Sequence, residues 1–296
     1  MWSATPEEIT QMDATTQVAL VTGASRGIGP YIARSLAEAG YKLVLASRSG
    51  PELQAQAHML LAKGAEVVAI PADLTDPESV EQLAAAAEKA FGRVDVLVNN
   101  AGGDPQQEFD EMTWAENETI VKLNLLAPIQ LTRRLIPGML TRGRGHIVNI
   151  SSIAGRVSFP YTEAYAAAKD GLIGFTRVLR NDYRSRGVSA SVIVLGAIRG
   201  AGQGQRTAEE VGLKMPAAGT SPAGDVARAV VRAVKKDRAE IVVMPGPGRL
   251  LKALMDLFPG MGPAMNSMAG ANATMKRVIE YRNAGRTSKL IGPSSP

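Results

Sequence analysis

Residues 18–29 read VALVTGASRGIG, a short aliphatic run followed at once by a glycine-rich turn. The run Val18–Val21 contains no charged residue and is typical of a buried strand. Apolar residues then recur every fourth position, at Ile28, Ile32 and Leu36, as they do along one face of a helix. The stretch therefore predicts a strand, a tight turn and a helix, which together form the first unit of an α/β fold.

Six more apolar runs repeat the strand pattern along the chain. They are Lys42–Ala46, Glu66–Ile70, Val94–Asn99, His146–Ser151, Ser189–Leu195 and Glu240–Met244. Longer segments of helical character separate these runs, and such alternation is typical of parallel strands joined by helices. The expected fold is a single Rossmann-type α/β domain, a doubly wound parallel sheet of about seven strands with helices on both faces.

Local signals predict where several helices begin and end. Asp76-Pro77 and Ser221-Pro222 each read as an N-cap residue followed by proline at the first helical position. The helix expected over residues 113–140 contains Pro128 and Pro137, which predict a bend and an early end.

The composition excludes several classes of protein. Hydrophobic residues make up 45% and charged residues 21% of the 296 residues, which is ordinary for a globular chain. Cysteine is absent and there are two histidines, His58 and His146, so disulfides, thiolate chemistry, a Ser-His-Asp triad and a metal site are not expected. The net charge of +5 comes without a block of basic residues, so nucleic-acid binding is not expected either.

Both ends of the chain bear on localisation. Residues 1–16 form a polar N-terminal extension with three acidic residues and no Lys or Arg, which does not resemble a targeting leader. The uncharged run Leu257–Met275 is broken by proline and glycine and makes a poor membrane span, so no transmembrane segment is expected. We expect a cytoplasmic protein. Methionines in the extension 249–296 indicate core packing or an adaptable apolar surface, and peripheral membrane contact through residues 249–275 stays open.

The glycine turn after the first strand has the chemistry of a phosphate site. Its spacing, Gly-x-x-x-Gly-x-Gly, lets the backbone turn tightly and approach a pyrophosphate, whose charge is stabilised by free amides and the positive end of the helix. No Gly-Lys-Ser/Thr follows, which argues against a P-loop ATPase. The turn predicts a dinucleotide site.

The turn and two later motifs together resemble the short-chain dehydrogenase/reductase family. Asp73 in PADLT matches an acid that the family places near the adenine ring, and Asn99-Asn100-Ala101-Gly102 matches its signature after the fourth strand. The resemblance covers residues 17–245 and implies a dinucleotide-binding catalytic domain over 17–248, with a lid at 200–220. The expected cofactor-binding residues are Gly23, Ser25, Arg26, Gly27, Ile28, Gly29, Ser47, Arg48, Asp73, Leu74, Asn100, Ala101, Gly102, Tyr165, Lys169, Gly196 and Ile198.

The end of the second strand indicates which cofactor is bound. An NAD site places an acid there for the ribose 2′-hydroxyl, but this strand ends Ala46-Ser47-Arg48 with no acid before Glu52. Arg48, with Arg26 from the glycine turn, can form charge-assisted bonds to a 2′-phosphate. We therefore predict NADP(H), with NAD(H) as the second choice.

Four residues match the catalytic positions of the family. Tyr165 and Lys169 lie four apart in a helix expected from Thr162 to Arg184, so they share one face; Ser152 ends the fifth strand, and Asn124 lies in the preceding helix. The resemblance implies that Tyr165 is the acid/base, Lys169 holds the nicotinamide ribose, Ser152 polarises the carbonyl and Asn124 supports a water relay. A nearby Lys169 ammonium is expected to lower the pKa of Tyr165 by about three units.

One stretch departs from the family pattern. The family commonly reads Pro-Gly-x-x-x-Thr after the sixth strand, whereas residues 195–200 read LGAIRG. Gly196 is retained, but the proline and the threonine are replaced. Anchoring of the nicotinamide is then expected from the backbone groups of Ile198, with Arg199 as the alternative.

The sequence predicts an NADP(H)-dependent oxidoreductase that reduces a ketone or ketoacyl carbonyl to a secondary alcohol. The substrate is a small carbonyl or alcohol, with an apolar one left open, and pairing of the helices that carry Asn124 and Tyr165 implies a homodimer or homotetramer. Three alternatives remain: an NAD-dependent alcohol dehydrogenase, a non-catalytic dinucleotide-binding sensor, and an acyl-carrier or coenzyme A ketoacyl reductase. The last of these would use Arg142, Arg144 and Arg177 against an acidic partner.

Overall fold

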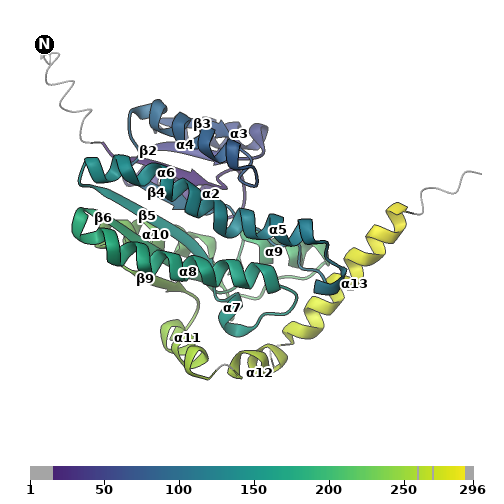
Figure 1. The fold of residues 1–296 in the computed structure, drawn as a ribbon. Coiled ribbons are helices and arrows are strands. Elements are labelled where there is room, and N and C mark those ends of the chain that lie inside the picture. Colours follow the sequence, from purple (N-terminus) through teal and green to yellow (C-terminus); the bar gives the residue numbers. More distant parts are fainter. Residues whose placement is uncertain (1–15, 259, 269, 291–296) are drawn as a thin grey trace, which may run out of the picture.

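The computed structural model describes residues 16–258, 260–268 and 270–290, so most of the predicted N-terminal extension 1–16 lies outside the described residues, as do residues 291–296. A parallel sheet of seven strands crosses the molecule in the order β3-β2-β1-β4-β5-β6-β9 (Figure 1). The strands are β1 (Val18–Thr22), β2 (Lys42–Ser47), β3 (Val67–Pro71), β4 (Val96–Asn99), β5 (Gly145–Ser152), β6 (Val188–Leu195) and β9 (Glu240–Val243). The predicted fold class and all seven predicted strands are confirmed.

Three helices cover each face of the sheet. On one face, a single apolar cluster joins the sheet to α2 (Gly29–Glu38), α3 (Gly50–Leu61) and α10 (Ala223–Lys236). On the other, a second cluster joins it to α4 (Pro77–Phe91), α6 (Ala127–Thr141) and α8 (Glu163–Tyr183). Every residue of β1 is buried because this strand lies between β2 and β4 with helices on both sides. The strand order reverses direction at β1 and β4, which opens a crevice at their carboxyl ends.

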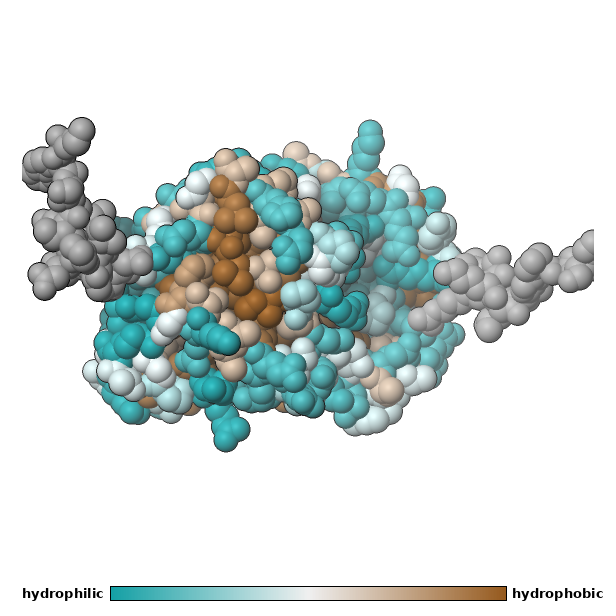
Figure 2. Space-filling view, turned by 90° about the horizontal axis from the view of Figure 1, so that it is seen from above, coloured by the Kyte–Doolittle hydropathy of each residue, from teal (hydrophilic) through white to brown (hydrophobic). Residues whose placement is uncertain are grey.

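The β3 edge of the sheet faces the viewer in Figure 2, which looks at the molecule from above. A narrow apolar stripe crosses a mainly hydrophilic surface there. Among the residues that the structure describes, no helix is long and apolar enough to cross a membrane.

The helical region 113–140 is built differently from the prediction. It consists of α5 (Trp114–Val121), a π-helical turn (Lys122–Leu126) and α6, which begins next to Pro128. The early end predicted at Pro137 is wrong, because α6 continues to Thr141 with this proline in its interior. The missing backbone hydrogen bond is offset by burial of Leu135, Ile136 and Met139 against the sheet.

The segment after β6 contains more regular structure than a glycine-rich loop. It has a short helix, α9 (Gly202–Glu210), and a two-stranded sheet of β7 (Ile198–Arg199) and β8 (Ser221–Pro222). Ser221 was predicted to cap the next helix, but its amide bonds the Ala197 carbonyl at 2.9 Å and α10 begins only at Ala223. The strand pairing takes the serine out of the capping position.

The C-terminal segment forms three helices at the carboxyl-end side of the sheet. They are α11 (Gly248–Leu257), α12 (Met261–Met268) and α13 (Ala271–Leu290), and α11 and α12 contact the short helix α7 (Ala154–Val157) that follows β5. Asn266 donates to the carbonyls of Val157 and Ser158 at 2.6 and 3.0 Å. Met255 is buried whereas Met268 is exposed, so the methionines divide between packing and surface. The last helix, α13, runs from the end of α12 back toward α5 and α9 (Figure 1).

Candidate active site

A cleft of about 370 Å³ opens at the carboxyl ends of the central strands. Fourteen of the predicted cofactor-binding residues line it: Gly23, Ser25, Arg26, Gly27, Ile28, Ser47, Arg48, Asp73, Leu74, Asn100, Ala101, Gly102, Tyr165 and Lys169. Three do not: Gly29, Gly196 and Ile198. Gly29 packs so closely that a Cβ there would overlap the Gly23 carbonyl, Gly196 packs against Met244, and Ile198 is buried in the core.

The glycine turn is held open by contacts with the end of β4. Gly23 has a φ of +65°, and a Cβ on it would lie 2.8 Å from the Ala101 Cα, so only glycine fits. The amides of Asn100 and Ala101 both donate to the Thr22 hydroxyl at 3.0 Å, and the Asn100 side chain donates to the Thr22 carbonyl at 2.9 Å. These bonds hold the glycine turn and the loop after β4 together on either side of the crevice.

Two arginines line the far end of the cleft. Arg26 and Arg48 are exposed and line it, and no acidic side chain occupies the end of β2. Asp73 is held by its own loop, because the Thr75 amide and hydroxyl donate to its carboxylate at 2.9 and 2.8 Å and lower its pKa. This end of the cleft therefore fits a dinucleotide that carries an additional phosphate.

Asn124 and Lys169 meet at the loop that follows β4. The Asn124 side chain accepts from the Gly103 amide at 3.2 Å and donates to the Gly103 carbonyl at 2.8 Å. A Cβ on Gly102 would lie 2.7 Å from Asn124 Oδ1 and 3.2 Å from Lys169 Nζ. Pro128 has no N–H to donate to the carbonyl four residues earlier, and the π-helical turn at Asn124 results.

The Ser152 hydroxyl donates to the Tyr165 oxygen and accepts from the Ala154 amide at 3.1 Å. Lys169 Nζ lies 5.6 Å from the centre of the Tyr165 ring and donates to the Ile150 carbonyl at 3.0 Å. The structure thus brings Ser152, Tyr165, Lys169 and Asn124 to one end of the cleft.

The expected lowering of the Tyr165 pKa is wrong. Burial raises the pKa of Tyr165 to about 12, and the hydrogen bond from Ser152 opposes this only in part. Burial also lowers the pKa of Lys169 to about 8. Desolvation disfavours the charged form of each of the two groups.

Sequence reasoning missed Asp104, which lies two residues after the Asn-Asn-Ala-Gly motif. Burial raises the pKa of Asp104 to about 6, and its charge in turn raises the pKa of Tyr165. One of its carboxylate oxygens, Oδ2, is buried without a hydrogen-bond partner. No local pattern distinguishes this aspartate from an ordinary turn residue.

Sequence reasoning also missed three cleft residues from α9, namely Gly202, Gln203 and Arg206. The glycine content of the segment hid the helix that carries them. Arg142, Arg144 and Arg177, expected to meet an acidic partner, lie elsewhere. Arg144 and Arg177 line a cavity at the amino ends of the strands, and Arg142 donates to the Val94 carbonyl at 2.7 Å.

Comparison with known proteins agrees with this geometry. Residues 17–211 match the family model described as short chain dehydrogenase. A ketoacyl reductase, HetN, from a Nostoc species is 38% identical over 251 residues, covering 84% of this chain and 85% of the relative. A 3-oxoacyl-[acyl-carrier-protein] reductase from a Synechocystis species is 38% identical over 185 residues, covering 62% of this chain and 75% of the relative.

Two solved structures are similar across most of the chain. A metagenomic short-chain oxidoreductase in complex with NADP superposes with a TM-score of 0.67 at 33% identity, covering 78% of this chain and 97% of the other. A variant actinorhodin polyketide ketoreductase with NADPH gives a TM-score of 0.68 at 27% identity, covering 79% and 97%. The sheet order, the glycine turn and these matches lead to one conclusion: the chain belongs to the short-chain dehydrogenase family.

Proposed function

We propose that the protein is an NADP(H)-dependent carbonyl reductase that converts a ketone or a ketoacyl group to a secondary alcohol. One observation carries the proposal: a single cleft joins an end lined by Arg26 and Arg48 to an end where Tyr165, Ser152 and Lys169 meet. That arrangement matches the two ends of a phosphorylated dinucleotide and a reacting carbonyl. The NADP and NADPH complexes of the similar structures support the choice of cofactor.

Bound NADPH supplies the hydride that reduces the carbonyl carbon. The protein has to stabilise the negative charge that develops on the carbonyl oxygen and then to protonate it. Tyr165, with its pKa of about 12, keeps its proton at neutral pH and presents it next to Ser152. We assign Tyr165 as the proton donor and Ser152 as a hydrogen-bond donor to the same oxygen.

Lys169 and Asn124 are assigned to resupply that proton. Lys169 is buried and lies beside the Tyr165 ring, and its pKa of about 8 allows it to gain or lose a proton close to neutral pH. Asn124 lies next to Lys169 across Gly102. We propose that Asn124 supports a water relay that returns protons to Lys169.

Residues 17–248 are proposed as the catalytic domain and residues 249–296 as an extension, of which α11 and α12 pack against α7. A cytoplasmic homodimer or homotetramer is proposed for the assembly. Its support is the exposed apolar side chains on the helices expected to pair: Trp114 on α5, Leu126 before α6 and Val178 on α8.

A ketoacyl thioester is the substrate class that the relatives favour, because two of them are named as ketoacyl or 3-oxoacyl reductases. Arg142, Arg144 and Arg177, which we expected to bind an acidic carrier, do not line the cleft, so the structure adds no support for docking of a carrier through them. A panel of simple ketones, sugars and acyl thioesters distinguishes these substrates.

The test combines cofactor titration with one substitution and a matched control. Tyr165→Phe should lower kcat by about 10²- to 10⁴-fold, the contribution typical of a general acid, while the NADPH affinity measured by nicotinamide fluorescence stays unchanged. Tyr161→Phe removes the hydroxyl of a tyrosine outside the cleft and should leave both values as in the wild type. Normal turnover of Tyr165→Phe would overturn the mechanism. A wild-type chain that binds NADPH but reduces nothing would support the sensor alternative.

A further inference from the structure

The side chains of α9 make contacts on two sides of the helix. Gly202 and Arg206, four residues apart, line the cleft beside the glycine turn. Thr207 and Glu210 bond instead to the loop after β4 and to the C-terminal helix α13, and Gln203, which also lines the cleft, bonds to that same loop. Spacings of three and four residues keep each set on its own side of a helix. The helix therefore connects the cofactor cleft to the C-terminal extension.

The cleft face of α9 presents a cation to the glycine turn. A Cβ on Gly27 would lie 3.4 Å from an Arg206 side-chain nitrogen and 3.5 Å from the Gly202 Cα. Burial lowers the pKa of Arg206, and the nearby charge of Arg26 lowers it further, opposed by Glu209. Across the described part of the chain, neither Arg26 nor Arg206 takes part in a salt bridge. Two guanidinium groups held near each other in this way form a site for an anion.

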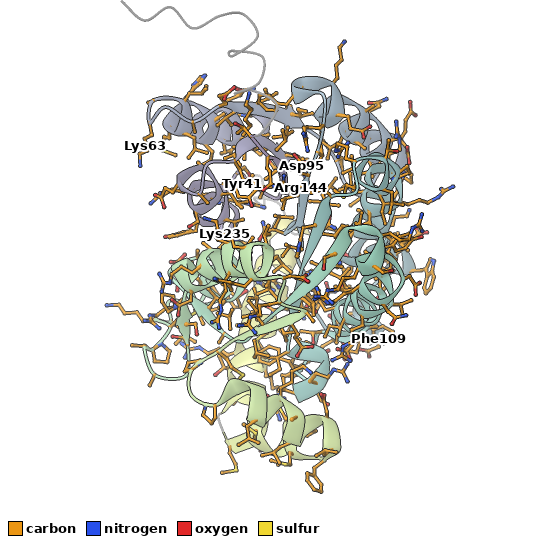
Figure 3. All side chains as sticks on the ribbon, turned by 90° about the vertical axis from the view of Figure 1, so that its left-hand side faces the viewer. Tyr41, Lys63, Asp95, Phe109, Arg144 and Lys235 are labelled. Atoms are coloured by element: carbon orange, nitrogen blue, oxygen red, sulfur yellow. The ribbon has the colours of Figure 1, made fainter. Side chains whose placement is uncertain are left out.

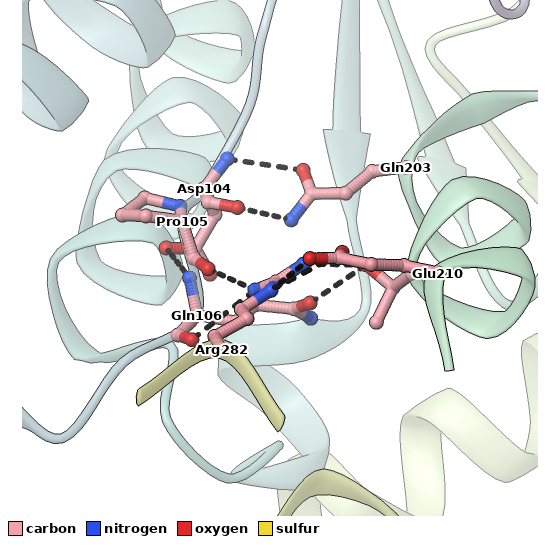
Figure 4. Close-up of polar contacts among 7 residues, drawn as sticks. Asp104, Pro105, Gln106, Gln203, Glu210 and Arg282 are labelled. Atoms are coloured by element: carbon pink, nitrogen blue, oxygen red, sulfur yellow. Dashed lines mark hydrogen bonds and ion pairs between the residues drawn. The ribbon is translucent and has the colours of Figure 1, made fainter. Parts of the chain in front are cut away.

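The opposite face is fastened to the loop that contains Asp104. The Gln203 side chain accepts from the Asp104 amide at 3.0 Å and donates to the Asp104 carbonyl at 2.6 Å (Figure 4). The buried Thr207 hydroxyl donates to the Gln106 side chain at 3.0 Å. These bonds set the distance between α9 and the end of β4.

Arg282 of α13 binds both α9 and the loop after β4, at the place where these two segments meet. Its guanidinium binds the Glu210 carboxylate at 2.7 and 3.1 Å and also donates to the carbonyls of Pro105 and Gln106. Burial of Met275, Val278 and Ile279 holds α13 against the protein one turn before Arg282. One side chain thus ties the C-terminal helix, α9 and the loop after β4 together (Figure 4).

We propose that Arg206 binds the pyrophosphate of the dinucleotide opposite the glycine turn, and that Arg282 is a positioning residue that holds α9 where Arg206 can do so. The proposal rests on the proposed function and adds a lid residue and a residue of the C-terminal extension to cofactor binding. We assign the pyrophosphate to Arg206 because Arg206 lies beside Gly27 of the glycine turn, where the pyrophosphate is expected. The 2′-phosphate is expected near Arg48, which directly follows β2. Since NADPH and NADH share the pyrophosphate, Arg206 should contribute equally to both.

The test is fluorescence titration of the full-length chain with NADPH and with NADH. Arg206→Ala should raise both Kd values about tenfold and leave their ratio unchanged, as expected for one lost charge-assisted contact. Arg228→Ala, which removes an exposed arginine of α10 paired only within its own helix, should change neither. An unchanged Kd in Arg206→Ala would overturn the proposal, and an effect on NADPH alone would overturn the assignment to the pyrophosphate.

Arg282→Ala tests the positioning role. It should raise both Kd values about threefold in the wild type but have little further effect in the Arg206→Ala background, because the two residues act through one contact. Arg282→Lys should recover part of the affinity. Glu210→Gln, which weakens the same junction from α9, should reproduce the Arg282→Ala result, and circular dichroism verifies that both variants fold.

Full additivity of Arg206→Ala and Arg282→Ala would overturn the link between them. Failure of the proposed function gives a different result: a wild-type chain that binds dinucleotide without reducing any carbonyl removes catalysis, while the comparison of Kd values still decides the role of Arg206. A wild-type chain that binds neither dinucleotide would overturn both proposals.

Discussion

The two ends of the parallel sheet differ in whether their charged groups form salt bridges. The larger cavity, about 1260 Å³, is at the amino ends of the strands, the side that faces the viewer in Figure 3. Both acids that line it are paired: Asp95 with Arg93 at 2.6 Å, and Asp237 with Arg180 and Arg184 at 2.7 Å. At the carboxyl ends the cleft is smaller, yet within the described residues none of the charged groups that line it forms a salt bridge.

The unpaired groups lie where the chemistry is expected. Arg26 and Arg206 lie near each other without an acid bridging them, a carboxylate oxygen of Asp104 is buried without a partner, and buried Lys169 donates to a single carbonyl. Leaving charges unpaired costs stability, and proteins tolerate that cost at binding sites. Charge pairing therefore identifies the site better than cavity volume. Substitutions of the paired groups at the amino ends of the strands should lower the free energy of unfolding and leave activity unchanged. Substitutions at the carboxyl ends should lower cofactor binding or activity and leave the free energy of unfolding nearly unchanged.

The largest effect on the paired end is expected from Asp95→Ala. The Asp95 side chain is fully buried, accepts the Val18 amide at 3.0 Å and binds Arg93. Removing it takes an acceptor away from the buried Val18 amide and from Arg93, which should lower the free energy of unfolding by about 3 kcal/mol. Urea denaturation measures this change, and kcat of the folded variant should equal that of the wild type.

Asp110→Ala is the matched control for Asp95, because Asp110 is exposed. It should change the free energy of unfolding by less than about 0.5 kcal/mol. A loss of activity in Asp95→Ala at full folding would break the contrast between the two ends of the sheet.

Arg48→Asp is expected to have the next largest effect, at the unpaired end. Replacing a cation by an anion at the end of β2 should weaken NADPH binding about 30-fold, because an acid there repels the 2′-phosphate. NADH affinity should rise or stay constant, so the ratio of the two Kd values changes. Arg34→Asp, a similar charge reversal on the surface of α2, should leave the ratio alone. Unchanged NADPH affinity in Arg48→Asp would reject the 2′-phosphate site.

Much of the fold and of the site could be predicted from the sequence because their signals are local. The strand runs give the sheet, and the glycine turn, Asn100 and Tyr165 with Lys169 each carry a short motif. Contacts between distant segments have no such signal. Arg282 bonds to Pro105 across 177 residues, and α9 is hidden in a segment whose glycines predict a loop.

Two further features of the site depend on tertiary packing. The pKa of Tyr165 is set by burial, which a motif does not report, so the predicted direction was wrong. The π-helical turn at Asn124 arises where the Pro128 ring meets a helix already packed on α8. Sequence motifs predict which residues come together, but they do not predict how far those residues are buried from solvent.

The smallest predicted effect returns to the paired end and concerns His146. Its Nε2 lies 2.7 Å from the Ser191 hydroxyl, which donates its own proton to the Arg238 carbonyl, so the neutral ring must donate through Nε2. Burial lowers the pKa of His146 to about 4. Because this pKa lies below that of the unfolded chain, the stability it contributes is present above about pH 6.5 and is lost as the pH falls.

The loss due to His146 should be about 0.7 kcal/mol between about pH 7 and about pH 6, measured as the change in the free energy of unfolding. His146→Gln keeps a donor toward Ser191 but cannot titrate, so its stability should be flatter over this range. His58→Gln, on the exposed face of α3, is the control and should retain the wild-type slope. If instead His146→Gln kept the full slope and His58→Gln lost it, the buried histidine would not be the group that couples this end of the sheet to pH.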